Sequence, residues 1–473
     1  MDRRKFIQNS VLLTAAVAGS KNAFSFINES FPTVRTPASE RNFHSPVIEE
    51  VIKKFSSSVS NKEMAWMFNN CFPNTLDTTV FPEEVGGKPY TYVITGDIDA
   101  MWLRDSCAQV WPYLPFMSED KKLQRLILGL INKQTQCVNK DPYANAFYND
   151  PQRTGDWAED KTNMQPGIHE RKWEIDSLCY TIRLAYHYWK TSGDTSAFDN
   201  EWVDAQKAIY KTFVEQQRKD GLGPYRFERE TTRGSDTLQV DGYGYPVNPV
   251  GLICSSFRPS DDSTVFSFLI PSNLFAVVSL RQSAEILRKV KNENSLADQM
   301  EALASEVEQA VNTHGIIDHP KFGRVYAFEV DGFGSFLMMD DANIPSLLSL
   351  PYLGAVAVDD EVYQRTRKYI LSTDNPFFFK GSAGEGIGGP HIGRDMIWPM
   401  AIIMRAKTSQ SDAEIKECLR MLLNTHGGTG FMHESFHKDN PKHFTRHWFA
   451  WVNTLFGELL WDLYKEKPSL LNV

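Results

Sequence analysis

Apolar side chains recur at helical spacing along most of this 473-residue chain. Leu178, Ile182, Ala185 and Tyr186, for example, fall at positions i, i+4, i+7 and i+8, which lie on one face of a helix. Patterns of this kind predict helices over residues 46–70, 102–115, 120–137, 173–191, 198–217, 272–290, 294–313, 342–355, 359–372, 394–407, 411–425 and 447–465.

The predicted helices alternate between two kinds. Residues 173–191 and 447–465 are rich in aromatic and small side chains, whereas 198–217 and 294–313 carry more charge. The first kind is typical of helices that are buried on most sides, and the second of helices with one exposed face. The alternation predicts an all-α fold with two concentric rings, six inner helices and six outer ones.

Long loops separate the predicted helices. Loops of this length are uncommon in a compact domain unless they are functional, so we expect them to form the active-site face. Short alternations of Tyr, Val and Phe within 221–250 and 320–340 predict minor β-hairpins. The loops that precede the predicted inner helices are 85–101, 138–172, 221–271, 373–393 and 426–446.

The first residues have the pattern of an export signal. The pair Arg3-Arg4 precedes an apolar run, 11–18, that is too short to span a bilayer, and small residues follow it. The stretch "DRRKFIQ" resembles a twin-arginine signal, which predicts an exported, periplasmic protein. No later segment is apolar enough for stable membrane insertion. The predicted organisation is a signal peptide over 1–23, a linker over 24–45 and a single catalytic domain over 46–473.

Composition narrows the class of protein. Hydrophobic residues make up 42% and charged residues 23%, which is typical of a globular chain. The formal net charge of −9 argues against a nucleic-acid partner, because phosphates need basic surfaces. The six cysteines form no C-x-x-C pair, so they predict buried thiols, with one disulfide left open, rather than a zinc or redox motif.

The stretch "GFMHESFHKDNPKHFTRHWFAW" contains His433-Glu434-Ser435-Phe436-His437, which matches the zinc signature H-E-x-x-H. Zinc binding needs both histidines on one face of a helix. Glycines at 427–430 and the run Lys438-Asp439-Asn440-Pro441 make this segment poor helix. We therefore interpret Glu434 as a loop carboxylate directed at a cleft, while a solvated glutamate remains open.

Four further clusters combine charged and aromatic residues near the starts of predicted helices. "WLRDS", from Trp102, can bind sugar hydroxyls through Arg104 and Asp105, or can form a structural ion pair. "RPSDDS" places Asp261 beside Asp262, and repulsion between adjacent carboxylates raises one pKa, as a general acid requires; an ordinary turn is the alternative. The other two clusters are "ERKWEIDS" and "HIGRDMIWP".

Together these motifs resemble glycoside hydrolase family 125, the exo-α-1,6-mannosidases. The resemblance covers nearly the whole chain after the signal. It implies an (α/α)6 toroid that hydrolyses terminal α-1,6-linked mannose with inversion, on a mannose-containing glycan, with no metal and no cofactor. The motifs, in chain order, are "GDIDAMWLRDS", "KWEIDSL", "FRPSDDS", "DDANIPSLLSLPYLG", "HIGRDMIWP" and "GFMHESFH".

The resemblance also implies roles for individual residues. Asp261 matches the general acid, although Asp262 is adjacent, and Glu434 matches the general base that activates water. In an inverting enzyme the two carboxyls stand roughly 6.5–9.5 Å apart. Positions implied for holding the mannose are Trp102, Arg104, Asp105, Glu174, Arg258, His391, Arg394 and Asp395.

Two other functions remain open from the sequence. One is a toroid glycosidase with a different sugar specificity, such as a glucoamylase-like enzyme, where a similar W-x-R-D-S motif occurs. The other is a non-catalytic glycan-binding protein, which the presence of both Asp261 and Glu434 disfavours. The oligomeric state and the natural glycan do not follow from the residues.

Overall fold

The computed structural model describes residues 31–473, and the predicted signal peptide lies outside them. Residues Val34–Val473 form one compact unit. Within residues 31–473, no helix is both long and apolar enough to cross a membrane. The six cysteines are all buried, free thiols.

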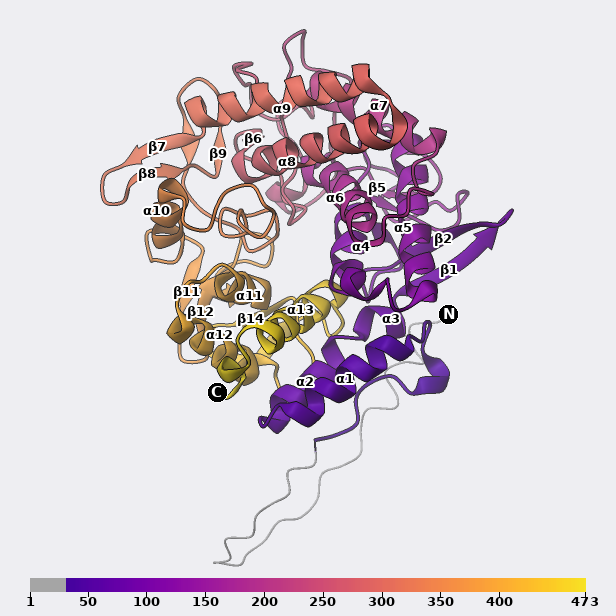
Figure 1. The fold of residues 1–473 in the computed structure, drawn as a ribbon. Helices are drawn as coiled ribbons and strands as arrows, with labels where there is room; N and C mark the ends of the chain where they lie inside the picture. The colour runs from indigo at the N-terminus through magenta and orange to yellow at the C-terminus, as the bar shows by residue number, and fades with distance from the viewer. Residues whose placement is uncertain (1–30) are drawn as a thin grey trace, which may run out of the picture. The chain divides into compact units, whose positions relative to one another are not determined.

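Helices dominate this unit (Figure 1). They are α1 (Pro46–Ser58), α2 (Lys62–Cys71), α3 (Asn74–Thr78), α4 (Leu103–Val110), α5 (Lys121–Lys140), α6 (Ile175–Ser192), α7 (Asn200–Gln216), α8 (Ile270–Ile286), α9 (Asn294–His314), α10 (Glu361–Ile370), α11 (Pro399–Lys407), α12 (Asp412–Thr425) and α13 (Ala450–Glu466).

The strands are short and form small antiparallel sheets. They are β1 (Val80–Val85), β2 (Lys88–Val93), β3 (Met101–Trp102), β4 (Ala146–Phe147), β5 (Ile168–Glu170), β6 (Phe268–Leu269), β7 (Ile316–His319), β8 (Gly323–Tyr326), β9 (Glu329–Val330), β10 (Phe336–Leu337), β11 (Phe378–Lys380), β12 (Glu385–Ile387), β13 (Met396–Ile397), β14 (Ser435–His437) and β15 (Asn440–Thr445).

The helices form two rings, which confirms the predicted toroid. In the inner ring, α4 packs against α6 and α13, α6 packs against α8, and α11 packs against α13. Helices α5, α7, α9, α10 and α12 lie outside this ring (Figure 1). Helix α8 is buried except for one partly exposed stripe of Val278, Arg281, Gln282 and Glu285. Helix α9 instead buries only one stripe, from Leu296 to Val311, because its other face is charged and exposed.

One predicted inner helix is wrong. Residues 342–355 form turns, although they are buried like an inner helix. Pro345 and Pro351 interrupt helical hydrogen bonding. The buried carboxyl of Asp340 instead accepts the backbone N–H groups of Leu347 and Leu348. This irregular segment takes the place between α8 and α11.

Two other local predictions differ from the structure. The predicted helix 46–70 is two helices: the first ends at Ser58, and Asn61 caps the second by accepting the N–H of Met64. Residues 221–250 contain no strand, whereas the hairpin predicted within 320–340 includes β8, β9 and β10.

Short strands precede several of the inner helices. Strand β3 leads directly into α4, β6 into α8, and β13 lies just before α11. The hairpin β14–β15 stands before α13, and β13 pairs with β14. These pairings bring the loops before several inner helices to one face, as the sequence predicts.

Candidate active site

A pocket of about 540 Å³ opens among these loops. Its walls come from the segments that precede α4, α6, α8, α11 and α13, with one residue from the irregular inner segment. The lining residues are Thr95, Ile98, Trp102, Arg104, Asp105, Trp157, His169, Glu170, Lys172, Arg229, Thr231, Thr232, Arg233, Asp236, Pro259, Ser260, Asp261, Asp262, Asn343, His391, Trp398, Glu434, Arg446, Phe449 and Trp451.

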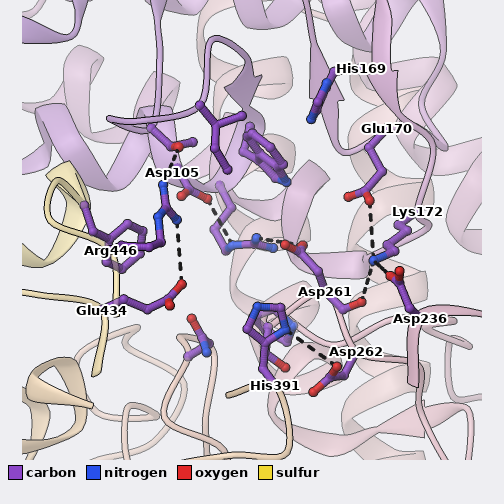
Figure 2. Close-up of a pocket in the computed structure, with 18 of the residues that line it drawn as sticks. Asp105, His169, Glu170, Lys172, Asp236, Asp261, Asp262, His391, Glu434 and Arg446 are labelled. Atoms are coloured by element: carbon purple, nitrogen blue, oxygen red, sulfur yellow. Dashed lines mark hydrogen bonds and ion pairs between the residues drawn. The ribbon is translucent and has the colours of Figure 1, made fainter. Parts of the chain in front are cut away.

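Most of the residues singled out in the sequence meet in this pocket. Figure 2 shows Asp261 and Glu434 directed into it from different walls, with His391 and Asp262 close to Asp261. The predicted residues that line the pocket are Trp102, Arg104, Asp105, Asp261, Asp262, His391 and Glu434.

Four predicted substrate residues do not line the pocket. Glu174 is completely buried behind Arg104. Arg258 is buried and pairs with Glu329 at 2.6 Å, so it supports the Asp261 turn instead. Arg394 is exposed, and Asp395 is half-exposed with its backbone carbonyl bonded to the N–H of Lys438.

Asp261 occupies the tip of a tight turn. Its φ of +65° lies in the left-handed region, which aspartate tolerates better than most residues. The turn is closed by Arg258, whose N–H donates to the carbonyl of Asp262 at 2.8 Å, and by Lys172, whose amine donates to the carbonyl of Asp261 at 2.8 Å. The backbone thus directs the Asp261 carboxyl toward Arg104.

Two cations govern the charge of Asp261. Burial raises its pKa, but Arg104 and Lys172, together with a hydrogen bond to Glu174 and the charge of His391, outweigh burial and bring the pKa to about 2. Arg104 Nη2 lies 3.3 Å from Oδ1 of Asp261. The carboxyl is therefore ionised at neutral pH in the unliganded protein.

Asp262 faces a different partner. Its side chain is almost fully buried, and Oδ1 lies 3.6 Å from Nδ1 of His391. Burial lowers the pKa of His391, but the Asp262 carboxylate opposes it and the net pKa is raised. Asp262 thus favours the protonated form of the imidazole on the pocket wall.

Glu434 stands on the opposite wall, between a turn and β14. Within residues 31–473, no hydrogen bond to its carboxylate is present, and the nearest cation is Arg446, with Nη1 at 3.7 Å from Oε1. Arg446 is itself held by Asp97, which accepts from its Nε at 2.9 Å, and by Thr95. The carboxylate of Glu434 keeps free lone pairs for a water molecule in the pocket.

The H-E-x-x-H segment is not helical. His433 stacks on Phe444, and its ring nitrogens contact the Arg446 carbonyl and the Thr429 hydroxyl. His437 lies in β14 and stacks on His443. Among residues 31–473, no group of three or more His, Cys, Asp or Glu side chains has an arrangement that could hold a metal ion. The loop interpretation of Glu434 agrees with this geometry.

Several pocket residues were missed in the sequence. Lys172 stands in the quoted cluster "ERKWEIDS" and Arg446 in the quoted stretch "HFTRHWF", but neither motif indicates which carboxylate its basic residue approaches. Trp157 and Arg229 stack with 3.7 Å between the guanidinium and the ring, but they come from separate loops with no motif. Only the fold brings such residues together.

Residues 61–461 match the family described as metal-independent alpha-mannosidase (GH125). This chain belongs to that family. It is 43% identical over 458 residues to the meiotically up-regulated gene 157 protein of Schizosaccharomyces pombe, a match that covers 93% of this chain and 90% of that protein. The protein is therefore a glycoside hydrolase.

Solved structures agree with the assignment. A Streptococcus pneumoniae metal-independent alpha mannosidase, solved as a non-productive substrate complex with alpha-1,6-mannobiose, is 41% identical. Its TM-score is 0.86, and the match covers 90% of this α-mannosidase and 100% of that chain. A bacterial glucoamylase complexed with acarbose has a TM-score of 0.54 at 12% identity, covering 88% of this chain and 59% of that one, which shows a shared fold.

Proposed function

We propose that this GH125 α-mannosidase removes terminal mannose from α-1,6-linked mannosides with inversion of the anomeric carbon. The observation that carries the proposal is the pair Asp261 and Glu434, directed into one pocket from different walls (Figure 2). The α-1,6-mannobiose bound by the pneumococcal relative supports the linkage. Because the site is a pocket rather than an open groove, it suits the end of a glycan chain.

In the proposed reaction, Asp261 donates a proton to the glycosidic oxygen as the bond to the anomeric carbon breaks. Glu434 takes a proton from a water molecule that attacks the opposite face of that carbon. The free lone pairs of Glu434 suit this role, because no other group in residues 31–473 donates a hydrogen bond to them. The products are β-mannose and the shortened glycan.

The pocket walls suit a hexose. Trp102 offers an apolar ring, and Arg104, Asp105 and His391 offer donors and acceptors for hydroxyl groups. Indole and imidazole side chains recur around the cavity, including His169, whose ring packs edge-on against Trp102 with centroids 5.0 Å apart. We infer that Trp102 and its neighbours hold the terminal mannose.

The test is digestion of α-1,6-mannobiose with the product anomer followed by NMR. Initial release of β-mannose supports the proposal. Initial release of α-mannose would indicate retention and reject the pairing of Asp261 with Glu434. Cleavage of α-glucosides in preference to α-mannosides would favour the glucoamylase-like alternative, and binding without cleavage of any substrate would favour a glycan-binding protein.

We further propose that the chain is exported to the periplasm through the signal in residues 1–23, which the Arg3-Arg4 pair and the short apolar run support. Cell fractionation of the full-length protein tests this. Retention in the cytoplasm of the wild type contradicts it, and Arg3→Lys with Arg4→Lys distinguishes twin-arginine export from general export.

A further inference from the structure

The proposed acid begins in the wrong charge state. A general acid must carry a proton when the glycosidic bond breaks. Arg104 and Lys172 instead favour the carboxylate of Asp261 in the unliganded pocket. Either the proton arrives from solvent with each turnover, or a group in the wall stores it beside Asp261.

The wall behind Asp261 has more carboxyls than cations. The guanidinium of Arg104 is nearly fully buried and contacts four of them. Mutual repulsion in a buried cluster disfavours full ionisation of all four and favours the retention of a proton among them. The four are Asp105 at 3.3 Å, Glu174 at 2.7 Å, Asp176 at 3.3 Å and Asp261 at 3.3 Å.

The two oxygens of Glu174 have different surroundings. Oε2 accepts from Arg104 Nη1 at 2.7 Å and from the Ser177 hydroxyl at 2.9 Å. No N–H or hydroxyl group within residues 31–473 donates to Oε1, which is fully buried. The Glu174 and Asp261 carboxyls lie within hydrogen-bond reach of each other. A proton shared between the two carboxyls gives one of them a donor and relieves their repulsion.

Burial supports the same location for the proton. Burial raises the pKa of Glu174 well above its ordinary value, although Arg104 opposes the rise, and the charge of Asp261 raises it further. The Asp261 side chain is 24% exposed, whereas that of Glu174 is 0% exposed. The less hydrated carboxyl keeps the proton, and the two groups titrate as a pair.

We propose that Glu174 is a positioning residue whose carboxyl stores one proton in the unliganded pocket and transfers it to Asp261 when the glycosidic oxygen of the substrate displaces water there. The inference rests on the proposed role of Asp261 as the acid. It makes Glu174 part of the reaction although it touches neither the sugar nor the attacking water.

The proton transfers balance. The O–H bond at Glu174 breaks as one forms at Asp261, and the proton then passes to the glycosidic oxygen, whose bond to the anomeric carbon breaks with its electron pair. The leaving sugar departs as an alcohol. The attacking water gives its hydroxyl to the anomeric carbon and its other proton to Glu434. Glu434 then releases one proton to solvent and the Glu174–Asp261 pair regains one, which restores the starting state.

Other charged groups face the pair from neighbouring elements. Asp105 and Arg104 come from α4, Asp176 from α6, Lys172 from the segment before α6, and His391 from the loop before β13. Glu434 and Arg446 face it from the β14–β15 hairpin. His391 also has a raised pKa, so a pH profile alone does not identify Glu174. A second readout, the dependence on the leaving group, is needed.

The test compares Glu174→Gln with wild type on α-1,6-mannobiose and on dinitrophenyl α-mannoside. The amide keeps an oxygen for Arg104 but has no proton to give up. We expect kcat on mannobiose to fall by about tenfold or more, with the ~10²–10⁴-fold that a general acid contributes as the upper range. The dinitrophenyl substrate needs little protonation, so its kcat changes far less. The basic limb of the mannobiose kcat/KM profile moves to lower pH, because Asp261 alone keeps its proton less well.

Asp176→Asn is the matched control. Asp176 is buried, stands two residues after Glu174 in the first turn of α6 and contacts the same guanidinium, but no hydrogen bond joins it to Asp261. If the cluster acts only through structure, both variants lower the rates on both substrates by similar factors. A leaving-group dependence confined to Glu174→Gln supports proton storage, and equal losses on both substrates for that variant overturn it.

Two further variants separate this inference from the proposed function. If Asp261→Asn lowers kcat by the same factor on both substrates, the assignment of Asp261 as the acid fails. If only Asp261→Asn shows leaving-group dependence, the acid stands and the role of Glu174 is rejected. Should Glu174→Gln not fold, Glu174→Asp keeps a titratable carboxyl at a greater distance. That variant must then show a smaller loss of kcat than Glu174→Gln, still larger on mannobiose than on the dinitrophenyl substrate. The same loss of kcat on both substrates overturns the proposal.

Discussion

Asp261 and Glu434 enter the same pocket, but their surroundings differ. Asp261 stands on a strained turn and faces Arg104, Lys172 and a second carboxyl, Glu174, all within a buried network. Glu434 stands at the edge of a short hairpin with one cation, Arg446, at 3.7 Å. A proton donor needs groups that load it, whereas a base for water needs free lone pairs. Substitutions on the two walls should therefore lower kcat in different ways on substrates with poor and good leaving groups.

The largest effect is expected on the Glu434 wall. Glu434→Gln removes the base, so attack by water slows for every substrate. We expect kcat to fall by ~10²–10⁴-fold on both mannobiose and dinitrophenyl mannoside, because water must attack in each case. Parallel kinetics on the two substrates measure this.

Azide sharpens the assignment. A small anion can occupy the space of the attacking water and needs no base, so azide should restore Glu434→Gln and give the β-mannosyl azide, identified by NMR. Asp261→Asn is the control and should form no such product on mannobiose. An α-azide product, or rescue of neither variant, would contradict the assigned role of Glu434.

On the other wall, Arg104→Lys should lower kcat on mannobiose by roughly 10²-fold, the cost of a small misplacement of a reacting group. Lysine keeps the charge, but its single ammonium cannot bond Glu174 and Asp261 through separate nitrogens as Nη1 and Nη2 do. Steady-state kinetics with a thermal melt measure both consequences.

Arg258→Lys is the matched control for that variant. Arg258 is also buried and paired with a carboxylate, Glu329, but it does not line the pocket. Its replacement should lower thermal stability with a much smaller loss of kcat. Equal losses of kcat for the two arginines would mean that the Arg104 network acts only as general support.

Asp97→Asn tests the support of the Glu434 wall. The Asp97 carboxylate accepts from Arg446 Nε, and a hydrogen bond to a charged group contributes about 1.5–3 kcal/mol. Because Asp97 is exposed and Thr95 also holds Arg446, we expect only about a tenfold loss, equal to about 1.4 kcal/mol. The loss should be the same on both substrates. A loss confined to mannobiose would place Arg446 on the acid side instead.

A smaller, pH-dependent effect is expected at Asp262. Its carboxylate raises the pKa of His391 above the ordinary value of 6.5, so the imidazolium persists above that pH. A folded-state pKa raised in this way stabilises the fold fully below pH 6.5, and the stabilisation is lost as pH rises through the folded pKa. Asp262→Asn should lower the pKa of His391, measured by NMR of the imidazole C2–H.

Thermal melts supply the control for that variant. Asp262→Asn should destabilise the protein more at pH 6 than at pH 9, because only the protonated imidazole gains from the carboxylate. A His391 pKa that does not change, or a stability loss that is equal at the two pH values, would show that the contact at 3.6 Å carries no charge interaction.

Much of this architecture followed from local patterns. The helices predicted over 173–191 and 294–313 match α6 and α9 to within two residues, because their apolar periodicity and charge agree with their places in the rings. The segment 342–355 has comparable apolar content but forms turns, because its prolines break the ladder and Asp340 satisfies amides from outside the segment. Hydrogen bonds from a side chain to irregular backbone leave no periodic signal in the sequence.

The site divides in the same way. Motifs identified the candidate carboxylates and Arg104, since each lies in a compact cluster of charged and aromatic residues. The residues that contact these groups are distant in the sequence. Lys172 is 89 positions from Asp261, and Asp97 is 349 positions from Arg446, which faces Glu434. Glu174 was recognised but expected to touch the sugar, because sequence spacing does not tell which side of Arg104 it occupies.

The smallest effect is expected from removing metal ions. His433 and His437 lie outside any helix, and each ring is engaged with a neighbouring aromatic ring rather than directed at a shared point. Exhaustive treatment with EDTA should leave kcat unchanged, and metal analysis should find no stoichiometric zinc.

His437→Gln, which changes a residue outside the pocket, should alter activity by no more than about twofold, the range of a substitution within ±0.5 kcal/mol. If the protein carried one zinc per chain, and if both chelation and His437→Gln abolished activity, Glu434 would act beside a metal and not as a free base. The contrast between the two walls would then rest on a metal site instead of on free lone pairs.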